Sequence, residues 1–219
     1  WSRFDRILPR ISGRFPSSDD WWDWVDLPEV NPRLLGFPRT GCLNLYGLGH
    51  YGRLPLVPLA MLLFEDEVIV HSCSGGVGAP RLLVRRGEPE SVQAAEAAGV
   101  MNERWFAREV YPELWADGEV SMVLFGGVFS HAVRRIPLPG TVGMTEALGA
   151  TVTPITPSAE LLAFAEKRRL DDALIQRIDI LRVDDRFRIM MFCDVDADLF
   201  FRHTTGGEAR LMAAVKSFG

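Results

Sequence analysis

Lysine is almost absent from this sequence, because only two of its 24 basic residues, Lys167 and Lys216, are lysine and the rest are arginine. This bias is typical of GC-rich genomes, but it also excludes nearly every position from a role that requires an ammonium group. Cysteine is scarce too, with three residues and no CxxC spacing. An odd number of cysteines without that spacing argues against a disulfide scaffold and favours a reduced, cytoplasmic setting.

Long apolar runs and a strong charge of one sign are also missing. No apolar run reaches the roughly 18 residues that a membrane-spanning helix needs, and the chain does not open with a signal-peptide pattern. The net charge is −5, so nucleic acid and anionic membranes are not expected as partners. Hydrophobic residues make up 47% and charged residues 24% of the chain. These fractions are typical of globular proteins, and they exclude bulk disorder and a coiled coil.

Periodicity and turn residues predict an α+β fold with largely antiparallel sheets. Two hairpins are expected, one with strands over 119–125 and 128–135 around Gly126-Gly127, the other with strands over 176–183 and 188–195 around Asp184-Asp185. A helix over 158–170 is expected to begin at Ser158, a favourable N-cap. The other expected elements are strands over 4–11, 67–71, 81–84, 104–111 and 151–155, and helices over 19–25, 88–99 and 207–218.

Four short motifs follow one another in a characteristic order. They are SGGVG at 74–78, GVFSHAVRR at 127–135, QRIDILR at 176–182 and LFFR at 199–202. The second and third resemble the G-E-[FY]-S-H-A-V-x-K hairpin and the A-R-V-D-x-V-R strand of the ATP-grasp superfamily, in its branch of bacterial glutathione-synthetase-like and D-cycloserine-type ligases. The other two resemble the Gly-rich loop of that branch and the L-F-L that follows its metal-binding strand.

The resemblance implies an ATP-grasp-like fold, with two largely antiparallel sheets, flanking helices and a cleft between the sheets. It divides the chain into a remnant of the N-terminal lobe plus linker at 1–58, a central subdomain with the Gly-rich loop at 59–114, and a C-terminal subdomain at 115–219. Because 1–10 resembles the last strand of the N-terminal lobe, we expect that lobe to be truncated.

The resemblance also implies lysines for the ATP phosphates and carboxylates for Mg²⁺, and several of these residues are replaced. The strand before the Gly-rich loop ends in His71 where a lysine is expected, and 37–42 lacks a second expected lysine. The two metal-binding glutamates align with Met191 and Cys193. We therefore expect ATP and Mg²⁺ to be less favoured than another cofactor.

Histidine, cysteine and methionine at these positions favour a haem or transition-metal cofactor, because they are softer ligands than glutamate and lysine. The expected cofactor-binding residues are His71, Cys193, Met191, His50, Gly75 and Gly76, with His71 and Cys193 as the metal ligands. For Cys193 the simpler interpretation is a core residue of an apolar strand.

We weigh three functions. We favour an enzyme that uses a haem or transition-metal cofactor in place of ATP to convert a small amino-acid-like substrate. The resemblance to this ligase branch implies that substrate class and a place in bacterial secondary metabolism, such as antibiotic biosynthesis. The expected catalytic or pocket residues of this enzyme are Arg177, Asp179, Ser130 and Arg134. A second hypothesis is a non-catalytic partner of an active ligase, and the sequence also allows a homodimer.

The third hypothesis is an ATP- and Mg-dependent carboxylate–amine ligase with atypical ligands. In this case Asp179, Asp194 and Asp196 would hold the metal. Arg81, Arg85 or Arg108 would take the place of the missing phosphate-binding lysines, because arginine binds phosphate bidentately.

Overall fold

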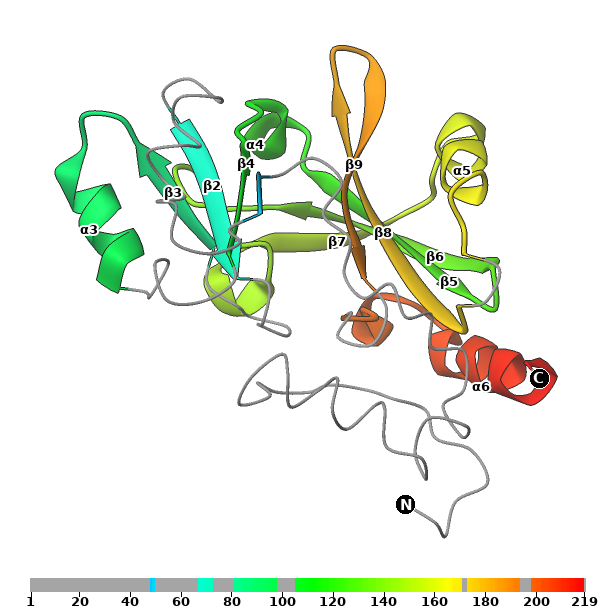
Figure 1. Ribbon diagram of the computed structural model, residues 1–219. Helices are drawn as coiled ribbons and strands as arrows, with labels where there is room; N and C mark the ends of the chain where they lie inside the picture. Colours follow the sequence, from blue (N-terminus) through cyan, green and yellow to red (C-terminus); the bar gives the residue numbers. More distant parts are fainter. Residues whose placement is uncertain are drawn as a thin grey trace, which may run out of the picture.

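The computed structural model describes residues 48–49, 67–72, 81–97, 105–170, 173–193 and 198–218. They form two antiparallel sheets with helices beside them, which confirms the expected fold class (Figure 1). The first sheet has the order β1-β4-β2-β3, with β1 at Leu48–Gly49, β2 at Glu67–Ser72, β3 at Arg81–Arg85 and β4 at Trp105–Glu109. Helix α3 (Pro89–Ala97) packs beside β3.

The second sheet has five strands in the order β7-β6-β5-β8-β9, and each neighbouring pair is antiparallel. Its strands are β5 (Glu119–Phe125), β6 (Val128–Ile136), β7 (Thr151–Ile155), β8 (Ile175–Val183) and β9 (Arg186–Cys193). Both expected hairpins are present. Their central residues, Gly126-Gly127 and Asp184-Asp185, all have positive φ angles, as tight turns that match the twist of the flanking strands require.

Ser158 begins helix α5 (Ala159–Glu166) as expected, because its Oγ accepts a hydrogen bond from the Leu161 amide at 3.1 Å. The helix ends earlier than the expected residue 170. The buried Gln176 side chain binds the chain just beyond the helix, accepting from the Leu170 amide and donating to the Arg168 carbonyl. A tertiary contact therefore replaces the last helical turn.

The remaining helical segments lie between strands or after β9. They are α4 (Glu113–Ala116), α6 (Gly207–Ser217) and two short 3-10 turns, η2 (Glu146–Leu148) and η3 (Phe201–His203). The sequence predicted α6 closely but missed α4, which is a single turn after Pro112 and is too short to show a helical period. The expected strand at 4–11 and helix at 19–25 lie outside the described residues, as does most of the expected segment 1–58.

The five-stranded sheet buries a different set of side chains on each face, because successive residues of a strand point to opposite sides. One face packs Met122, Leu124, Ile178 and Ile180 against α5. The other face carries Val123, Phe125 and Val133 with residues 199–200, and α6 packs against it. Towards the four-stranded sheet, this second face becomes polar, and the candidate site lies there.

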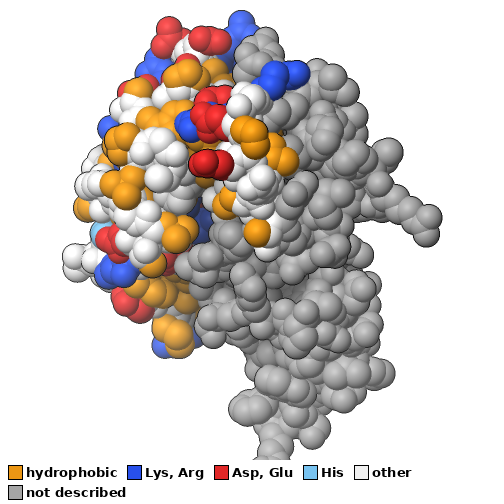
Figure 2. Space-filling model, turned by 90° about the vertical axis from the view of Figure 1, so that its left-hand side faces the viewer, with side chains coloured by type: hydrophobic (Ala, Val, Ile, Leu, Met, Phe, Trp, Pro, Cys, Tyr) orange, Lys and Arg blue, Asp and Glu red, His pale blue; other side chains and the backbone are white. Residues whose placement is uncertain are grey.

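Charge is mixed on the surface that includes α3 and β3. Figure 2 shows positive and negative side chains interspersed with apolar ones among the described residues of that face. Among the helices described, none combines the length and apolar character that crossing a membrane requires.

Candidate functional site

Ionised side chains are buried where the two sheets meet, and we call this group the arginine–carboxylate cluster. It comprises the buried residues Arg108, Glu119, Arg135, Arg177 and Asp179, together with Arg81, which is partly exposed. Arg108 comes from β4 of the four-stranded sheet, whereas Glu119, Arg135 and Asp179 come from β5, β6 and β8 of the other sheet. These four side chains are at most 3% exposed. Buried charges are rare unless they are paired or bind a ligand, so the cluster is the candidate site.

Asp179 accepts hydrogen bonds from two neighbours and forms an ion pair with a third. Ser121 Oγ donates to Oδ1 at 2.7 Å, and Arg177 donates from Nε to Oδ1 at 2.9 Å and from Nη2 to Oδ2 at 3.0 Å. Arg135 Nη2 lies 2.9 Å from Oδ2. Burial by itself would raise the pKa of Asp179, but the charges of Arg135 and Arg177 and these hydrogen bonds outweigh burial and hold the pKa well below its usual range.

Glu119 links the two sheets through arginines. Its Oε1 accepts from Arg135 Nη2 at 2.6 Å, and its Oε2 lies 3.9 Å from Arg108 Nη2. The second distance is an ionic contact but is too long for a hydrogen bond. Within the described residues Glu119 Oε2 therefore has no hydrogen-bond donor.

Several arginine nitrogens in the cluster also lack partners in the described part of the chain. All three side-chain nitrogens of Arg108 are buried without a hydrogen-bond acceptor, as are Nη1 of Arg81 and Nε of Arg135. Burial and neighbouring positive charge lower the pKa of Arg108, and they lower that of Arg81 to about 10. Both groups stay protonated at neutral pH, so the cluster offers buried positive charge and free donors to an anion.

Phe200 forms an apolar base beneath two of the arginines. The guanidinium carbons of Arg135 and Arg177 lie 5.6 and 5.7 Å from the centre of its ring, within range of a cation–π interaction. Phe200 has φ 49°, and its amide donates to Asp198 Oδ1 at 2.9 Å. A left-handed conformation is rare for a bulky residue, and this contact holds Phe200 in place.

Met191 and Cys193 occupy the positions expected from the resemblance. They lie directly across from Asp179 and Arg177 in the β8–β9 pairing, so the four side chains share one face of the sheet. The Cys193 thiol is 4% exposed and accepts a hydrogen bond from Arg177 Nη2 at 3.2 Å. Two soft sulfur groups beside a carboxylate bound by arginines do not fit Mg²⁺, which requires hard oxygen ligands.

Metal binding by the expected ligands is not established by the described residues, which contain no group of three or more His, Cys, Asp or Glu side chains that could hold a metal ion. The backbone of His71 pairs with Arg81 and Phe106, but the His71 side chain is outside what the structure describes. The other expected residues outside the described ranges are His50, Gly75, Gly76, Asp194 and Asp196.

The four expected catalytic residues are not brought together. Arg177 and Asp179 belong to the cluster, whereas Arg134 points to the opposite face and lines a separate cavity. Ser130 is the extra residue of a bulge in β6, where Val123 pairs with His131 and Leu124 with Phe129.

Ser130 belongs to a chain of hydrogen bonds that connects β6 with α6. Arg210 Nε donates to Ser130 Oγ at 2.8 Å, and Ser130 Oγ lies 2.8 Å from His131 Nδ1. His131 Nε2 lies 2.7 Å from the Leu199 carbonyl and must donate to it. A neutral ring then accepts from the Ser130 hydroxyl. Burial lowers the pKa of His131, in agreement with this neutral form.

Two of the three arginines proposed as lysine substitutes, Arg81 and Arg108, belong to the cluster, whereas Arg85 pairs with Glu67 at 2.6 Å. Glu119 and Arg135 also belong to the cluster, although neither was predicted as a site residue from the sequence. The hairpin motif could have indicated Arg135, because the final lysine of G-E-[FY]-S-H-A-V-x-K falls on this residue.

No protein-family model matches the sequence, and no curated protein matches it either. Solved structures do match. A D-cycloserine synthetase, DcsG, superposes with a TM-score of 0.73 at 17% identity, over 99% of this chain and 84% of that one. A D-alanine–D-alanine ligase from Bacillus anthracis, complexed with ATP, gives 0.54 at 13% identity, over 78% of this chain and 58% of that one.

A third match is a RimK domain ATP-grasp protein from Sphaerobacter thermophilus, with a TM-score of 0.52 at 14% identity, over 79% of this chain and 59% of that one. This chain therefore covers less than two thirds of the length of the last two structures. At these identities the matches establish the fold, and they confirm the ATP-grasp-like architecture that the motifs indicated.

Proposed function

We propose that this chain, which has the ATP-grasp fold, binds an oxyanion-bearing ligand between its two sheets through Arg81, Arg108 and Arg135. The observation that carries the proposal is Arg108, which is 2% exposed and has no hydrogen-bond acceptor for any of its three side-chain nitrogens among the described residues. An isolated buried charge is strongly unfavourable, so a ligand that supplies acceptors there would bind well.

The charge balance of the cluster supports an anion in particular. Four guanidinium groups surround two carboxylates within the described residues, and Asp179 is already engaged by Arg135 and Arg177. Phosphate and carboxylate groups match the planar donor pattern of arginine. Because Met191 and Cys193 do not suit Mg²⁺, we propose that the arginines bind the anion without a divalent metal.

Thermal unfolding in the presence of ATP, pyrophosphate or inorganic phosphate, each with excess chelator, tests this function. A ligand at about 100 times its Kd stabilises the native state by about 2.7 kcal/mol, which corresponds to a Tm increase of about 5–10 °C for a chain of this size. We expect an increase of this order for at least one of the three anions. The Arg108→Met variant should lose the increase, and a matched change of an exposed arginine, Arg186→Gln, should keep it.

Two results would overturn the proposal. One is the absence of any shift with all three anions. The other is a shift that appears only with Mg²⁺, which would favour the carboxylate–amine ligase with atypical ligands.

A haem or transition-metal cofactor is a second candidate, supported by the sulfur groups of Met191 and Cys193 on the same sheet face as the arginines. Arginines pair readily with carboxylates such as haem propionates. Protein expressed with added iron and a haem precursor should then show a Soret absorption band that His71→Ala alters. A folded, metal-replete sample without that band would remove this candidate.

The substrate proposal is a small amino-acid-like molecule of bacterial secondary metabolism. It is supported by two structural neighbours that are named for D-cycloserine and D-alanine. Adding D-alanine or D-serine together with the stabilising anion should raise the Tm further if the two sites adjoin. No additional shift with either amino acid would count against this substrate class.

A further inference from the structure

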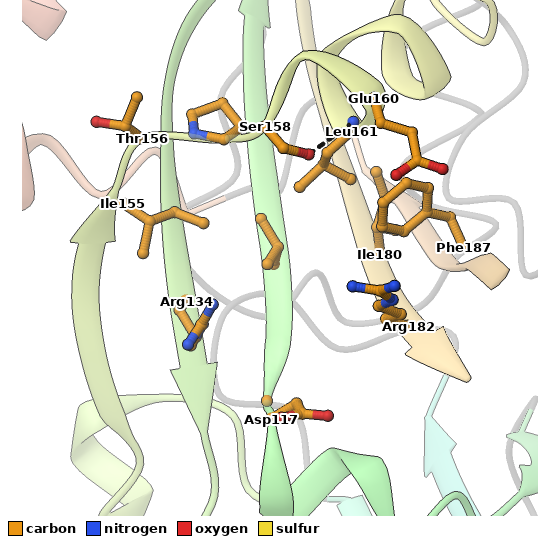
Figure 3. A pocket seen from close by; sticks show the side chains of 13 residues that line it. Asp117, Arg134, Ile155, Thr156, Ser158, Glu160, Leu161, Ile180, Arg182 and Phe187 are labelled. Atoms are coloured by element: carbon orange, nitrogen blue, oxygen red, sulfur yellow. Dashed lines mark hydrogen bonds between the residues drawn. The ribbon is translucent and has the colours of Figure 1, made fainter. Parts of the chain in front are cut away.

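A cavity of about 450 Å³ lies on the face of the five-stranded sheet opposite the arginine–carboxylate cluster. Its volume is within the range of small-molecule sites. Figure 3 shows that its walls come from β5 to β9 and from the start of α5. Val120 lines the cavity and is directly paired with Arg134 on β6 and with Ile180 on β8, so these three side chains share one face.

The base of the cavity is apolar. Val120 and Ile180 of the sheet, Leu161 of α5, and Ile155 and Phe187 of the outer strands contribute to it. Ile180 and Leu161 are buried, whereas the other three are partly exposed. This surface can hold the apolar body of a ligand.

Charged side chains of both signs surround this base. Arg134 and Arg182 project on either side of β5, Glu160 lies beside Leu161 at the start of α5, and Asp117 lies just before β5 (Figure 3). Arg182 pairs with Asp185 at 2.9 Å. Within the described part of the chain, no side-chain hydrogen bond or ion pair engages Arg134, Glu160 or Asp117.

Arg134 and the carboxylates of Glu160 and Asp117 line the same cavity but do not pair with one another. Such an arrangement suits a ligand that carries one positive and one negative group. A carboxylate would pair with Arg134, an ammonium group would pair with Glu160 or Asp117, and the apolar body would cover the base between them. We propose that this cavity binds a zwitterionic amino acid or dipeptide with an apolar side chain. The site is separate from the cluster, which lies on the other face of the sheet.

Calorimetric titration with four probes tests the inference. Leucine and leucyl-leucine carry both charges, N-acetyl-leucyl-leucine lacks the ammonium group, and leucyl-leucine amide lacks the carboxylate. We expect one or both zwitterions to bind, and both blocked dipeptides to bind at least tenfold more weakly. Binding of leucine alone would identify a single amino acid, and tighter binding of leucyl-leucine would identify a dipeptide.

Two variants test which residue pairs with the carboxylate of the ligand and which pairs with its ammonium group. Arg134→Gln should weaken leucyl-leucine at least fivefold and make it bind no better than its amide, and Glu160→Gln should reduce the discrimination against the acetylated form. Both side chains are exposed, so these variants should fold, and Arg86→Gln is a matched change of an exposed arginine in the turn after β3. Arg108→Met should keep the binding, which separates this site from the proposed anion site.

The inference is overturned if neither zwitterion binds, or if either blocked dipeptide binds as tightly as the zwitterion that binds best. Unchanged binding by Arg134→Gln would also overturn it.

Discussion

Arg108 Nη2 and Glu119 Oε2 lie 3.9 Å apart across the junction of the two sheets, and both side chains are almost completely buried. Glu119 is also bound by Arg135, whereas Arg108 has no closer acceptor among the described residues. The two members of this contact therefore differ in their effect on stability. Glu119 compensates two positive charges, and Arg108 adds one that the described protein groups compensate only in part.

Neutralising these two residues should change stability by very different amounts. Arg108→Met removes an incompletely paired buried charge, keeps similar volume and leaves Glu119 paired with Arg135, so the ligand-free protein should be about as stable as the wild type. Glu119→Gln leaves two buried guanidinium groups without their carboxylate and should cost about 3–5 kcal/mol. Urea unfolding of both variants measures this, and a larger loss in Arg108→Met than in Glu119→Gln would contradict it.

Acid should destabilise the protein through Asp179. Its folded-state pKa is lowered, so its contribution is fully present above the unfolded-state pKa of about 4 and is lost as the pH falls towards the folded-state value. Asp179→Asn should be less stable at pH 7 and lose less stability between pH 5 and 2. Unfolding free energies measured across that range check this, and parallel pH profiles for the two proteins would disprove it.

His131 should produce a separate loss of stability between about pH 7 and 5. Because burial lowers its folded-state pKa, stability is complete above the unfolded-state value of about 6.5 and decreases as the pH falls below it. His131→Gln should flatten the profile in this interval. His203→Gln, which leaves His131 in place, serves as the control and should retain the decrease; equal flattening by both variants would argue against this role.

Ser158 should stabilise α5 by capping its first turn. Ser158→Ala removes the hydrogen bond accepted from the Leu161 amide and should cost about 1 kcal/mol. Ser158→Asp preserves an acceptor at the cap and should restore most of the loss. Chemical unfolding compares the three proteins, and an aspartate variant as unstable as the alanine variant would show that the cap is not responsible.

The hairpins and the α5 start were predictable because their signals are local. Gly-Gly and Asp-Asp between alternating strands indicate tight turns, and Ser158 before an apolar helical stripe indicates an N-cap. The end of α5 was not predictable, because Gln176 from the following strand binds the last turn. The motifs also placed Met191 and Cys193 beside Asp179, and the register of β8 and β9 agrees.

The residues expected to be catalytic do not lie on one face of the sheet. Arg134 and Arg135 are neighbours in sequence, yet Arg135 joins the cluster and Arg134 faces the cavity beside α5. The alternation of a strand forces this separation, but choosing which residue faces which side requires the bulge at Ser130 and the pairing with β5. Neither is readable from the motif alone.

The sequence by itself determined the fold class, the two hairpins and the shortage of lysine that makes arginine the only abundant cation. Tertiary structure decided how those arginines are used. Arg108 comes from one sheet, and Glu119, Arg135 and Asp179 come from the other. Their charges act on one another strongly because the packed sheets exclude water from them. Such a group depends on contacts between residues far apart in the chain, so the positions of its charges follow from the packing of the two sheets.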